Sequence, residues 1–204
     1  ISADKMNVVY RGVSNPFTIS FAGIAANKVS AKTPGLKKGK TVTEKGRKKT
    51  LNGPSDYELD LTQLPKELRG KTRVDIVVTG ELPSGDRVVS KVPFRIKPLP
   101  TPFGSLDKRN PETVTKSELK TSTITATFGQ DFDFDLPLRV QGFKITIEGE
   151  GSYLCEGSEL SGPAKRAIDR ARRNSLVRVS EIRTRALGSS TEVNNALPAS
   201  FTII

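Results

Sequence analysis

The stretch MNVVYRGVSNPFTISFAG, residues 6–23, decides the fold of this chain. Apolar side chains recur at every second position on both sides of its centre, which is the period of a half-buried β-strand. They are Met6, Val8 and Tyr10 on one side and Phe17, Ile19 and Phe21 on the other. The pattern predicts two strands joined by a sharp turn, and with it a protein built mainly of β-structure.

The centre of this stretch, YRGVSNP, has the composition of a turn. Gly12 permits a backbone conformation that other residues avoid, and Asn15 is held extended because a proline follows it. Pro16 then sets the direction in which the next strand starts. Arg11 either stacks on Tyr10 or is exposed to a partner. Nothing here predicts catalysis, so Tyr10 and Arg11 are candidate partner-binding residues.

The first half of the chain continues as strands and ends in a proline-rich segment. RVDIVVTG and RVVSKVPFRI alternate in the same way and flank residues 82–86, whose Pro, Ser and Gly predict a hairpin loop. KPLPTPFGS, residues 97–105, contains three prolines, which cannot donate hydrogen bonds to a central strand. We therefore expect a first β-sandwich domain over residues 1–97, a stiff junction over residues 98–105 and a C-terminal domain over residues 106–204.

The second half repeats the strand pattern and adds one helix. STITATFG, FKITIEGEG, SLVRVSEIRTRA and ASFTII are strand-like. The helix lies near residues 162–173, with Ser161 as its cap, Pro163 in its first turn and Asn174 as a residue that can end it. Its buried stripe is Ala164, Ala167, Ile168 and Ala171. The expected fold class is mainly all-β, with two tandem immunoglobulin-like β-sandwich domains, the second carrying one short helix.

The composition excludes several kinds of active site. The 204 residues contain no histidine and a single cysteine, Cys155. Ser–His, Cys–His and zinc-type sites therefore cannot form, and neither can an intrachain disulfide. Cys155 lies in the strand-like SYLCEG, where a packed thiol is expected rather than a reactive one. We predict a protein with no enzymatic activity, no cofactor and no bound metal.

The chain starts with isoleucine and has no apolar run as long as a membrane span. It also lacks the pattern of a signal peptide. We expect a soluble fragment or a mature product.

Positive charge is concentrated in the first half of the chain. The formal net charge is +11, and eight basic residues but only one acid, Glu44, lie between Lys32 and Lys49. PGLKKGKT, residues 34–41, lacks the spacing of a phosphate-binding loop. The segment also lacks interleaved aromatic residues or a recognition helix, so we expect no nucleic-acid binding. We expect a long, flexible, solvated loop, with a polyanion- or glycan-binding site as the alternative. The candidate binding residues are Lys37, Lys38, Lys40, Arg47, Lys48 and Lys49.

A row of carboxylates in GQDFDFDLPL raises a catalytic alternative. Asp131, Asp133 and Asp135 alternate with two phenylalanines, so neighbouring carboxylates lie about 7 Å apart on one strand face. That separation suits an inverting glycosidase, with Glu148 as a further carboxylate, but such pairs normally face each other across a cleft. One strand also supplies too few oxygens for calcium. An amphipathic strand that buries Phe132 and Phe134 is the expected structure.

Several segments resemble the C-terminal periplasmic region of the gliding-motility M (GldM)/PorM family. MNVVYRGVSNPFTISFAG followed by NKVSA resembles the opening of that region, most closely over Asn7 to Pro16. FRIKPLPTP, residues 94–102, is similar to its domain junction, and FDFDLPLRVQGFKITI is similar to the strand pair that opens its last domain. LVRVSEIRTRALGSS and LPASFTII follow in the same order. The resemblance spans essentially the whole chain.

The resemblance implies a structural role in the type IX secretion system and the linked gliding machinery. In this family, an N-terminal transmembrane helix pairs with PorL/GldL to form a proton-driven motor in the inner membrane. The periplasmic part forms a homodimer and reaches the PorK/GldK and PorN/GldN ring near the outer membrane. This chain would be the distal, periplasmic end of that shaft. Arg166, Arg170 and Arg173 of the predicted helix join the candidate partner-binding residues.

Overall fold

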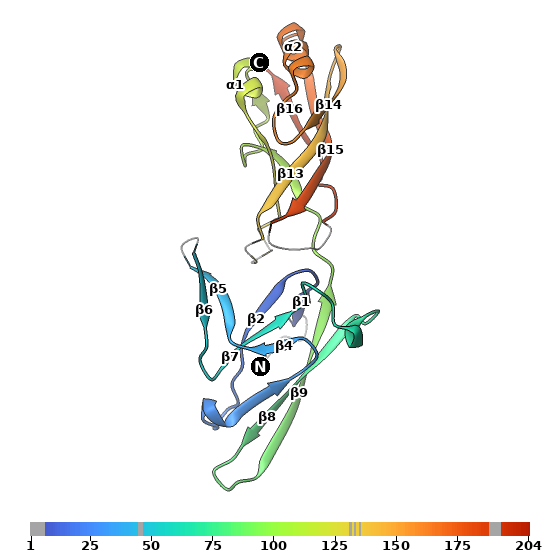
Figure 1. Ribbon diagram of the computed structural model, residues 1–204. Helices are drawn as coiled ribbons and strands as arrows, with labels where there is room; N and C mark the ends of the chain where they lie inside the picture. Colours follow the sequence, from blue (N-terminus) through green and yellow to red (C-terminus); the bar gives the residue numbers. More distant parts are fainter. Residues whose placement is uncertain (1–6, 45–46, 131, 133, 135, 188–192) are drawn as a thin grey trace. The chain divides into compact units, whose positions relative to one another are not determined.

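The computed structural model describes residues 7–44, 47–130, 132, 134, 136–187 and 193–204. These residues form two compact units, which divide between Leu99 and Pro100. Strands dominate both units (Figure 1), so the mainly β fold class predicted from the sequence is confirmed. No helix within these ranges combines the length and the hydrophobicity that a membrane span requires.

The first unit is a β-sandwich with a two-stranded ribbon beside it. Its four-stranded sheet has the order β1 (Val8–Tyr10), β9 (Arg87–Lys97), β8 (Arg73–Glu81) and β3 (Val29–Lys32). Its three-stranded sheet has the order β2 (Ser14–Thr18), β7 (Asp56–Asp60) and β4 (Leu36–Lys38). The ribbon consists of β5 (Lys40–Glu44) and β6 (Arg47–Leu51). Single 3-10 turns, Ala26–Lys28 and Lys66–Leu68, stand before β3 and β8.

The core of this unit lies between the two sheets and follows the alternation of the sequence. Ile76 of β8 is 2% exposed and packs in one cluster with Tyr57 of β7, which is also 2% exposed. On β1, however, the inward residue is Val9, which is fully buried, whereas Val8 and Tyr10 are only partly buried. The predicted apolar face of β1 was therefore wrong, because Val9 is paired with the inward Ile96 of β9. Met6 lies outside the described residues.

The β8–β9 hairpin forms as predicted. The strands pair antiparallel over their length, from Arg73 opposite Arg95 to Glu81 opposite Arg87. The loop closes through a hydrogen bond of 2.9 Å from the Leu82 amide to the Asp86 carbonyl, and Gly85 has a φ of 88°. Glycine suits such a φ because it has no Cβ to clash with the backbone.

The YRGVSNP corner is not a hairpin, contrary to the prediction of two strands joined by a turn. β1 pairs in parallel with β9, and β2 pairs antiparallel with β7, so the two strands belong to different sheets. The chain crosses between the sheets at Gly12, which has a φ of 82° and donates to the Leu61 carbonyl. Alternation indicates which face of a strand is buried but not which strand lies beside it, and this explains the error.

The side chain of Asn15 holds the corner together. It is 2% exposed. Its Oδ1 accepts from the Tyr10 amide at 2.8 Å, and its Nδ2 donates to the carbonyls of Tyr10, Val13 and Leu59 at 3.0, 3.1 and 3.3 Å. The end of β1, the turn and β7 are thus linked by one buried amide. Water cannot replace these bonds at such a burial, so the side chain is required for the crossing.

The second unit is built on a five-stranded sheet. Its order is β11 (Thr113–Val114), β16 (Ala199–Ile203), β15 (Leu176–Ala186), β13 (Leu138–Ile147) and β14 (Gly151–Glu156). β10 (Phe103–Leu106) and β12 (Ile124–Thr127) pair antiparallel beside it. β10 thus starts inside the proline-rich stretch that the sequence predicted as a junction. One continuous hydrophobic cluster joins the sheet, the β10–β12 pair and the helices.

The predicted helix is present but is shorter than expected. α2 (Gly162–Arg170) ends before Asn174, which has a φ of 68° in the following turn. Its predicted stripe, Ala164, Ala167, Ile168 and Ala171, is buried. The Ser161 side chain does not cap the helix, contrary to expectation. It lies 3.5 Å from the Cys155 Sγ instead.

A second helix, α1 (Lys116–Thr121), was not predicted. The Thr115 side chain accepts a hydrogen bond from the Glu118 amide at 3.2 Å and caps the helix. The sequence carried this signal, because Thr115 and Glu118 have the spacing of a capping box. α1 and α2 lie beside each other (Figure 1).

A β-bulge in β15 keeps both ends of that strand in the core. Gly142 of β13 is opposite Arg183 and Lys144 is opposite Ser180, so Glu181 and Ile182 share one partner position. Glu181 has a φ of 52° and is exposed, whereas Ile182 is fully buried. The bulge shifts the alternation by one residue, so that apolar residues before and after it face inward.

We predict that Asn15→Ala lowers the free energy of unfolding of the first unit by about 3 kcal/mol, because it removes the hydrogen bonds that the Asn15 side chain makes to backbone groups at a buried position. Hydrogen exchange of the amides in β1, β2 and β7 in the intact chain measures this loss. Asn7→Ala serves as the control and costs under about 0.5 kcal/mol, because Asn7 makes one exposed hydrogen bond, 3.3 Å to Pro93. Equal losses in both variants would contradict the role of Asn15.

A second prediction concerns the strained bulge residue. Glu181→Gly should leave the second unit about 1 kcal/mol more stable than Glu181→Ala, because only glycine accepts a positive φ without strain. Both variants lose the Lys144–Glu181 ion pair, so that loss cancels in the comparison. Exchange of the β13 and β15 amides in the two variants gives the difference. An alanine variant as stable as the glycine variant would show that the backbone here is not strained.

Candidate functional site

The described residues contain no group of three or more His, Cys, Asp or Glu side chains that could hold a metal ion. Cys155 is 1% exposed, and its Sγ accepts from the Ser161 amide at 3.3 Å. The predicted packed thiol is therefore confirmed. Asp131, Asp133 and Asp135, the carboxylates of the glycosidase alternative, lie outside the described residues. The surfaces that remain are those that bind through charge and shape.

The corner places Arg11 against the start of β8. The Arg11 amide donates to the Lys97 carbonyl at 2.9 Å, which continues the β1–β9 pairing by one residue. Its Nη2 donates to the Lys71 carbonyl at 2.8 Å. A backbone carbonyl that precedes β8 thus holds the guanidinium in place. Tyr10, opposite Lys97 on β9, is partly buried on the outer face of the four-stranded sheet.

The basic segment at residues 32–49 is not a flexible loop, contrary to prediction. It forms β4, β5 and most of β6, and two of its lysines, Lys37 and Lys40, form ion pairs with the acidic strand β7. Lys37 Nζ lies 2.8 Å from Asp60, and Lys40 Nζ lies 3.1 Å from Asp56. Lys38 Nζ donates to the Pro54 carbonyl at 2.7 Å and stands 4.3 Å from the centre of the Tyr57 ring.

The pairing changes the electrostatics of this segment. The hydrogen bond from Lys40 holds the pKa of Asp56 below its usual value, against a smaller effect of burial. Burial of Asp60 acts to raise its pKa, but the hydrogen bonds from Lys37 and Thr62 outweigh it, so the pKa is lowered. The hydrogen bond between Lys37 and Asp60 also raises the pKa of Lys37. The charges of Lys37 and Lys40 are therefore partly balanced by Asp60 and Asp56 within the chain.

The acidic partners were missed in the sequence, although a signal for them exists. Residues 56–60 read DYELD, with a carboxylate at every second position. A strand with that pattern presents one acidic face, and a lysine-rich strand beside it is its natural partner. Within the ribbon, Glu44 is opposite Arg47, Thr43 opposite Lys48 and Val42 opposite the exposed Lys49.

The candidate arginines of α2 belong to the second unit, whereas the corner and the basic segment belong to the first. Arg170 Nε lies 2.8 Å from Glu150, and this bond raises the pKa of Arg170. Arg166 on α2 and Arg173 after it are exposed. Positive charge at this end of a helix is favoured by the helix dipole, which is a sufficient structural reason for Arg170.

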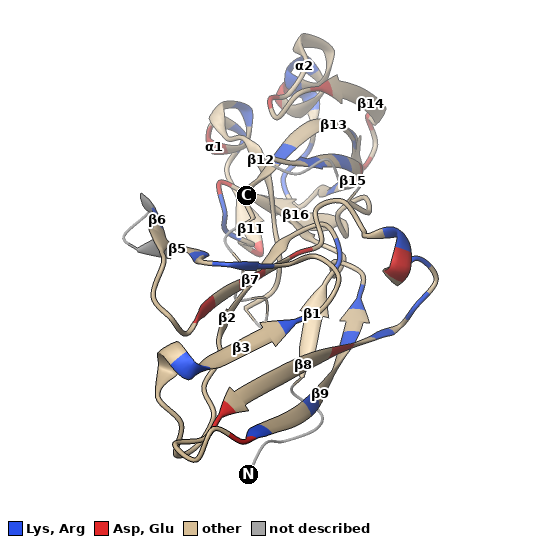
Figure 2. Ribbon diagram, turned by 60° about the horizontal axis from the view of Figure 1, so that its bottom comes forward, with Lys and Arg blue, Asp and Glu red and all other residues tan. Residues whose placement is uncertain are grey.

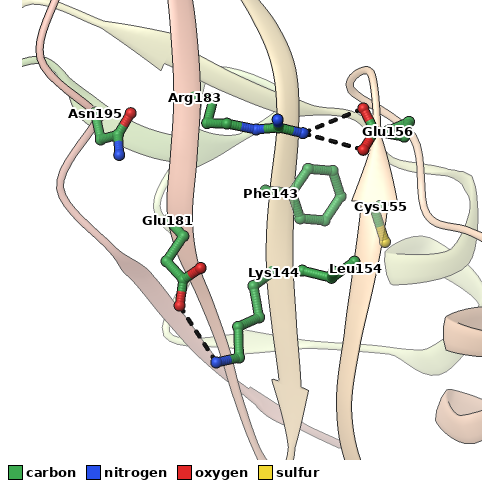
Figure 3. Close-up of a pocket in the computed structure, with 8 residues that line it drawn as sticks. All are labelled: Phe143, Lys144, Leu154, Cys155, Glu156, Glu181, Arg183 and Asn195. Atoms are coloured by element: carbon green, nitrogen blue, oxygen red, sulfur yellow. Dashed lines mark hydrogen bonds and ion pairs between the residues drawn. The ribbon is translucent and has the colours of Figure 1, made fainter.

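The outer face of the five-stranded sheet has a shallow cavity of about 320 Å³ (Figure 3). Arg183 of β15 reaches over β13 to Glu156 of β14, with its Nη2 at 3.0 and 3.2 Å from the two carboxylate oxygens. Gly142 permits this, because a Cβ there would lie 2.3 Å from Arg183 Nη2. Lys144 lies 3.2 Å from Glu181 on the other side of the cavity. The charged groups of this cavity are therefore paired with one another.

The Lys37–Asp60 pair generates a pH prediction. Because the folded-state pKa of Asp60 is lowered, its stabilising effect is complete above its ordinary value of 3.8 and is lost as the pH falls below that value. We expect the thermal midpoint of the first unit to fall less steeply below pH 3.8 in Asp60→Asn than in the unchanged chain. Asp75→Asn, at an exposed position on β8, is the control and should keep the original slope. Parallel curves for all three proteins would contradict this assignment.

Two solved structures are similar to this chain at low sequence identity. The fibronectin(III)-like modules of CbhA from Clostridium thermocellum match with 12% identity and a TM-score of 0.30, over 96% of this chain and 86% of theirs. A Ca²⁺-stabilised adhesin with which an Antarctic bacterium binds ice matches with 17% identity and a TM-score of 0.23, over 95% of this chain and 48% of that one. No curated protein matches.

Family models give a direct assignment. The model described as the GldM third domain matches residues 1–97, and the model described as the GldM C-terminal domain matches residues 97–204. Together they cover the whole chain, and they confirm the resemblance inferred from the sequence. The chain therefore belongs to the GldM family, a family of structural, periplasmic components of gliding motility and type IX secretion, and comprises its third and C-terminal domains.

Proposed function

We propose that this chain is a non-enzymatic coupling element that links a proton-driven motor in the inner membrane to the PorK/PorN (GldK/GldN) ring near the outer membrane. The observation that carries the proposal is the tandem match of two GldM domains over the whole chain. The link to the motor would run through PorL/GldL and an N-terminal transmembrane helix outside these residues. Its working state would be a homodimer, and it would bind proteins rather than nucleic acid.

The physical properties of the two units support this role. A coupling element must pass force along its length without unfolding, and strands held by long-range pairing and closed cores suit that demand. The first unit is fastened at its corner by the buried Asn15, and the second unit has one continuous core from β10 to β16. We propose residues 1–97 and 106–204 as its two domains, with residues 98–105 as a stiff junction. Three prolines restrict the backbone there.

All the candidate contact residues remain part of the proposal, but their charges are not equally available to a partner. They are Tyr10, Arg11, Lys37, Lys38, Lys40, Arg47, Lys48, Lys49, Arg166, Arg170 and Arg173. Lys37, Lys40 and Arg170 are engaged in ion pairs within the chain, so their charge contributes less to a partner. The same pairing weighs against the alternative of a polyanion- or glycan-binding module at residues 32–49.

The test is binding of the purified chain to the assembled PorK–PorN ring complex, at low salt and at a physiological salt concentration of about 150 mM. We expect saturable binding that weakens with salt but persists at the higher concentration, because charge mainly steers association while packed contacts hold the complex. Heparin is the comparison ligand for the polyanion alternative. Binding to heparin but not to the ring would contradict the coupling role.

A further inference from the structure

The strand β14 forms an open edge of the five-stranded sheet (Figure 1). Among the described residues it pairs with β13 on one side and with no strand on the other. In an antiparallel pair, the N–H and C=O groups of successive residues point to opposite sides of the strand. The Gly157 amide donates to the Gln141 carbonyl of β13 at 2.8 Å. The backbone groups of Ser152, Leu154 and Glu156, an odd number of positions earlier, therefore point to the open side.

These backbone groups are available to a partner. No hydrogen bond from the described part of the chain reaches them on the open side. The side chains of Ser152, Leu154 and Glu156 are exposed as well. Leu154 is 74% exposed, the highest value among the large hydrophobic side chains that the structure describes. The edge thus offers unpaired backbone groups beside an uncovered apolar side chain.

The edges of the other sheets of three or more strands are shorter or protected. β1 and β4 have three residues each, β3 has four and β11 has two. β2 has five, but they include Pro16, which has no N–H to donate. β14 has six residues without proline or lysine, and its pairing with β13 has no bulge. Proteins usually shorten or block their edges because an open edge recruits another strand, so β14 is the edge most suited to strand addition.

The cavity of about 320 Å³ borders this edge on the outer face (Figure 3). Leu154 and Glu156 belong to both the edge and the cavity, and Lys144, Glu181 and Arg183 line the rest. Arg183 binds Glu156 through Nη2 alone, and the Glu156 side chain is 83% exposed. A carboxylate has room for about four hydrogen bonds, so Glu156 can accept a second cation from the open side.

The charge nearest the open side is negative. Glu156 is the only charged residue of β14, so Figure 2 shows no blue on this strand. Arg178 lies on the same face, but on β15, two strands away from β14. An added strand would be about 14 Å from β15, beyond the Debye length of about 8 Å at physiological salt. The residue directly opposite Glu156 therefore decides the sign of the partner, and a basic residue is favoured there.

We infer that the β14 edge binds an extended segment of another protein, in which long basic side chains alternate with apolar ones. The segment adds antiparallel to the sheet as a further strand, with its backbone bonded to Ser152, Leu154 and Glu156. Its basic side chains lie on the outer face, where their methylene stems cover Leu154 and their charges reach Glu156. Its apolar side chains lie on the inner face, beside the partly buried Tyr153. This inference goes beyond the proposed function and does not depend on it.

An extended segment fits this surface better than a second copy of the chain. Two antiparallel β14 strands centred on Leu154 place Glu156 opposite Ser152, so neither carboxylate gains a basic partner. β14 also carries no long basic side chain that could enter the cavity. The contact between two such strands is short, because six residues span about 20 Å. A stable interface normally buries roughly 1,000 Å² or more.

The test is fluorescence anisotropy of a short labelled peptide of alternating lysine and valine, titrated with the intact chain. We expect saturable binding. N-methylation of the lysine amides should abolish it, because these amides face β14 when the lysine side chains lie on the outer face. N-methylation of the valine amides should change the affinity less than about threefold, because these amides point away from β14.

A pair of variants tests the same edge from the side of the protein. Leu154→Lys should weaken binding about tenfold, because a lysine at the edge repels the basic segment and removes an apolar contact. Leu176→Lys is the matched control, since it adds the same charge at a 50% exposed leucine of β15, and it should weaken binding less than about twofold. Both leucines are exposed, so both variants should fold, and their thermal midpoints check this.

Four results would overturn the inference. Equal affinities of the two methylated peptides would exclude antiparallel strand addition. Equal losses in Leu154→Lys and Leu176→Lys would mean that only net charge matters. Equal binding of a peptide with glutamate in place of lysine would contradict the role of Glu156. Self-association of the unchanged chain that Leu154→Lys abolishes, with no peptide binding, would assign the edge to a second copy. None of these measurements uses the ring proteins, so they leave the test of the proposed function separate.

Discussion

The hydrogen bonds of the Asn15 side chain fix where the chain passes from one sheet of the first unit to the other. One amide group accepts from the Tyr10 amide of the four-stranded sheet and donates to three carbonyls, including that of Leu59 in the three-stranded sheet. The parallel pairing of β1 with β9 follows from this crossing, as does the position of Arg11 beside Lys97. A buried amide that bonds to several backbone groups cannot be exchanged for an apolar side chain without the loss of these hydrogen bonds. The surface around the corner therefore depends on an interaction in the interior.

In the second unit, irregularities of the backbone fix the arrangement of surface side chains over the core. The bulge at Glu181 turns Ile182 inward and leaves the glutamate outside, where it pairs with Lys144. Gly142 leaves space above β13, and Arg183 fills that space to reach Glu156. These pairs cross neighbouring strands on an exposed face, so they add little stability. Their effect is to satisfy the charges that line the cavity.

Net charge alone was a poor guide to the binding surface of this protein. The most basic segment of the sequence, residues 32–49, lies beside the acidic strand β7. Carboxylates of that strand form ion pairs with Lys37 and Lys40. Arg11, Arg73 and Arg95 are far apart in the sequence, and only Arg11 was a candidate there, yet they lie at the same end of one sheet. A cluster of charge in sequence and a cluster of charge in space are thus different things, because strand pairing decides which charges become neighbours.

The sequence by itself determined the local structure and the family of this protein. Alternating residues predicted the strands, Leu82 to Asp86 the hairpin loop, and the stripe from Ala164 to Ala171 the helix, because these features depend on neighbours within a few residues. Only the tertiary structure decided that β1 and β2 lie in different sheets, that β4 to β6 replace a loop, and that Arg11 meets Lys97. Hydrogen bonds between strands join residues as distant as Val8 and Arg95, and alternation carries no information about that choice of partner.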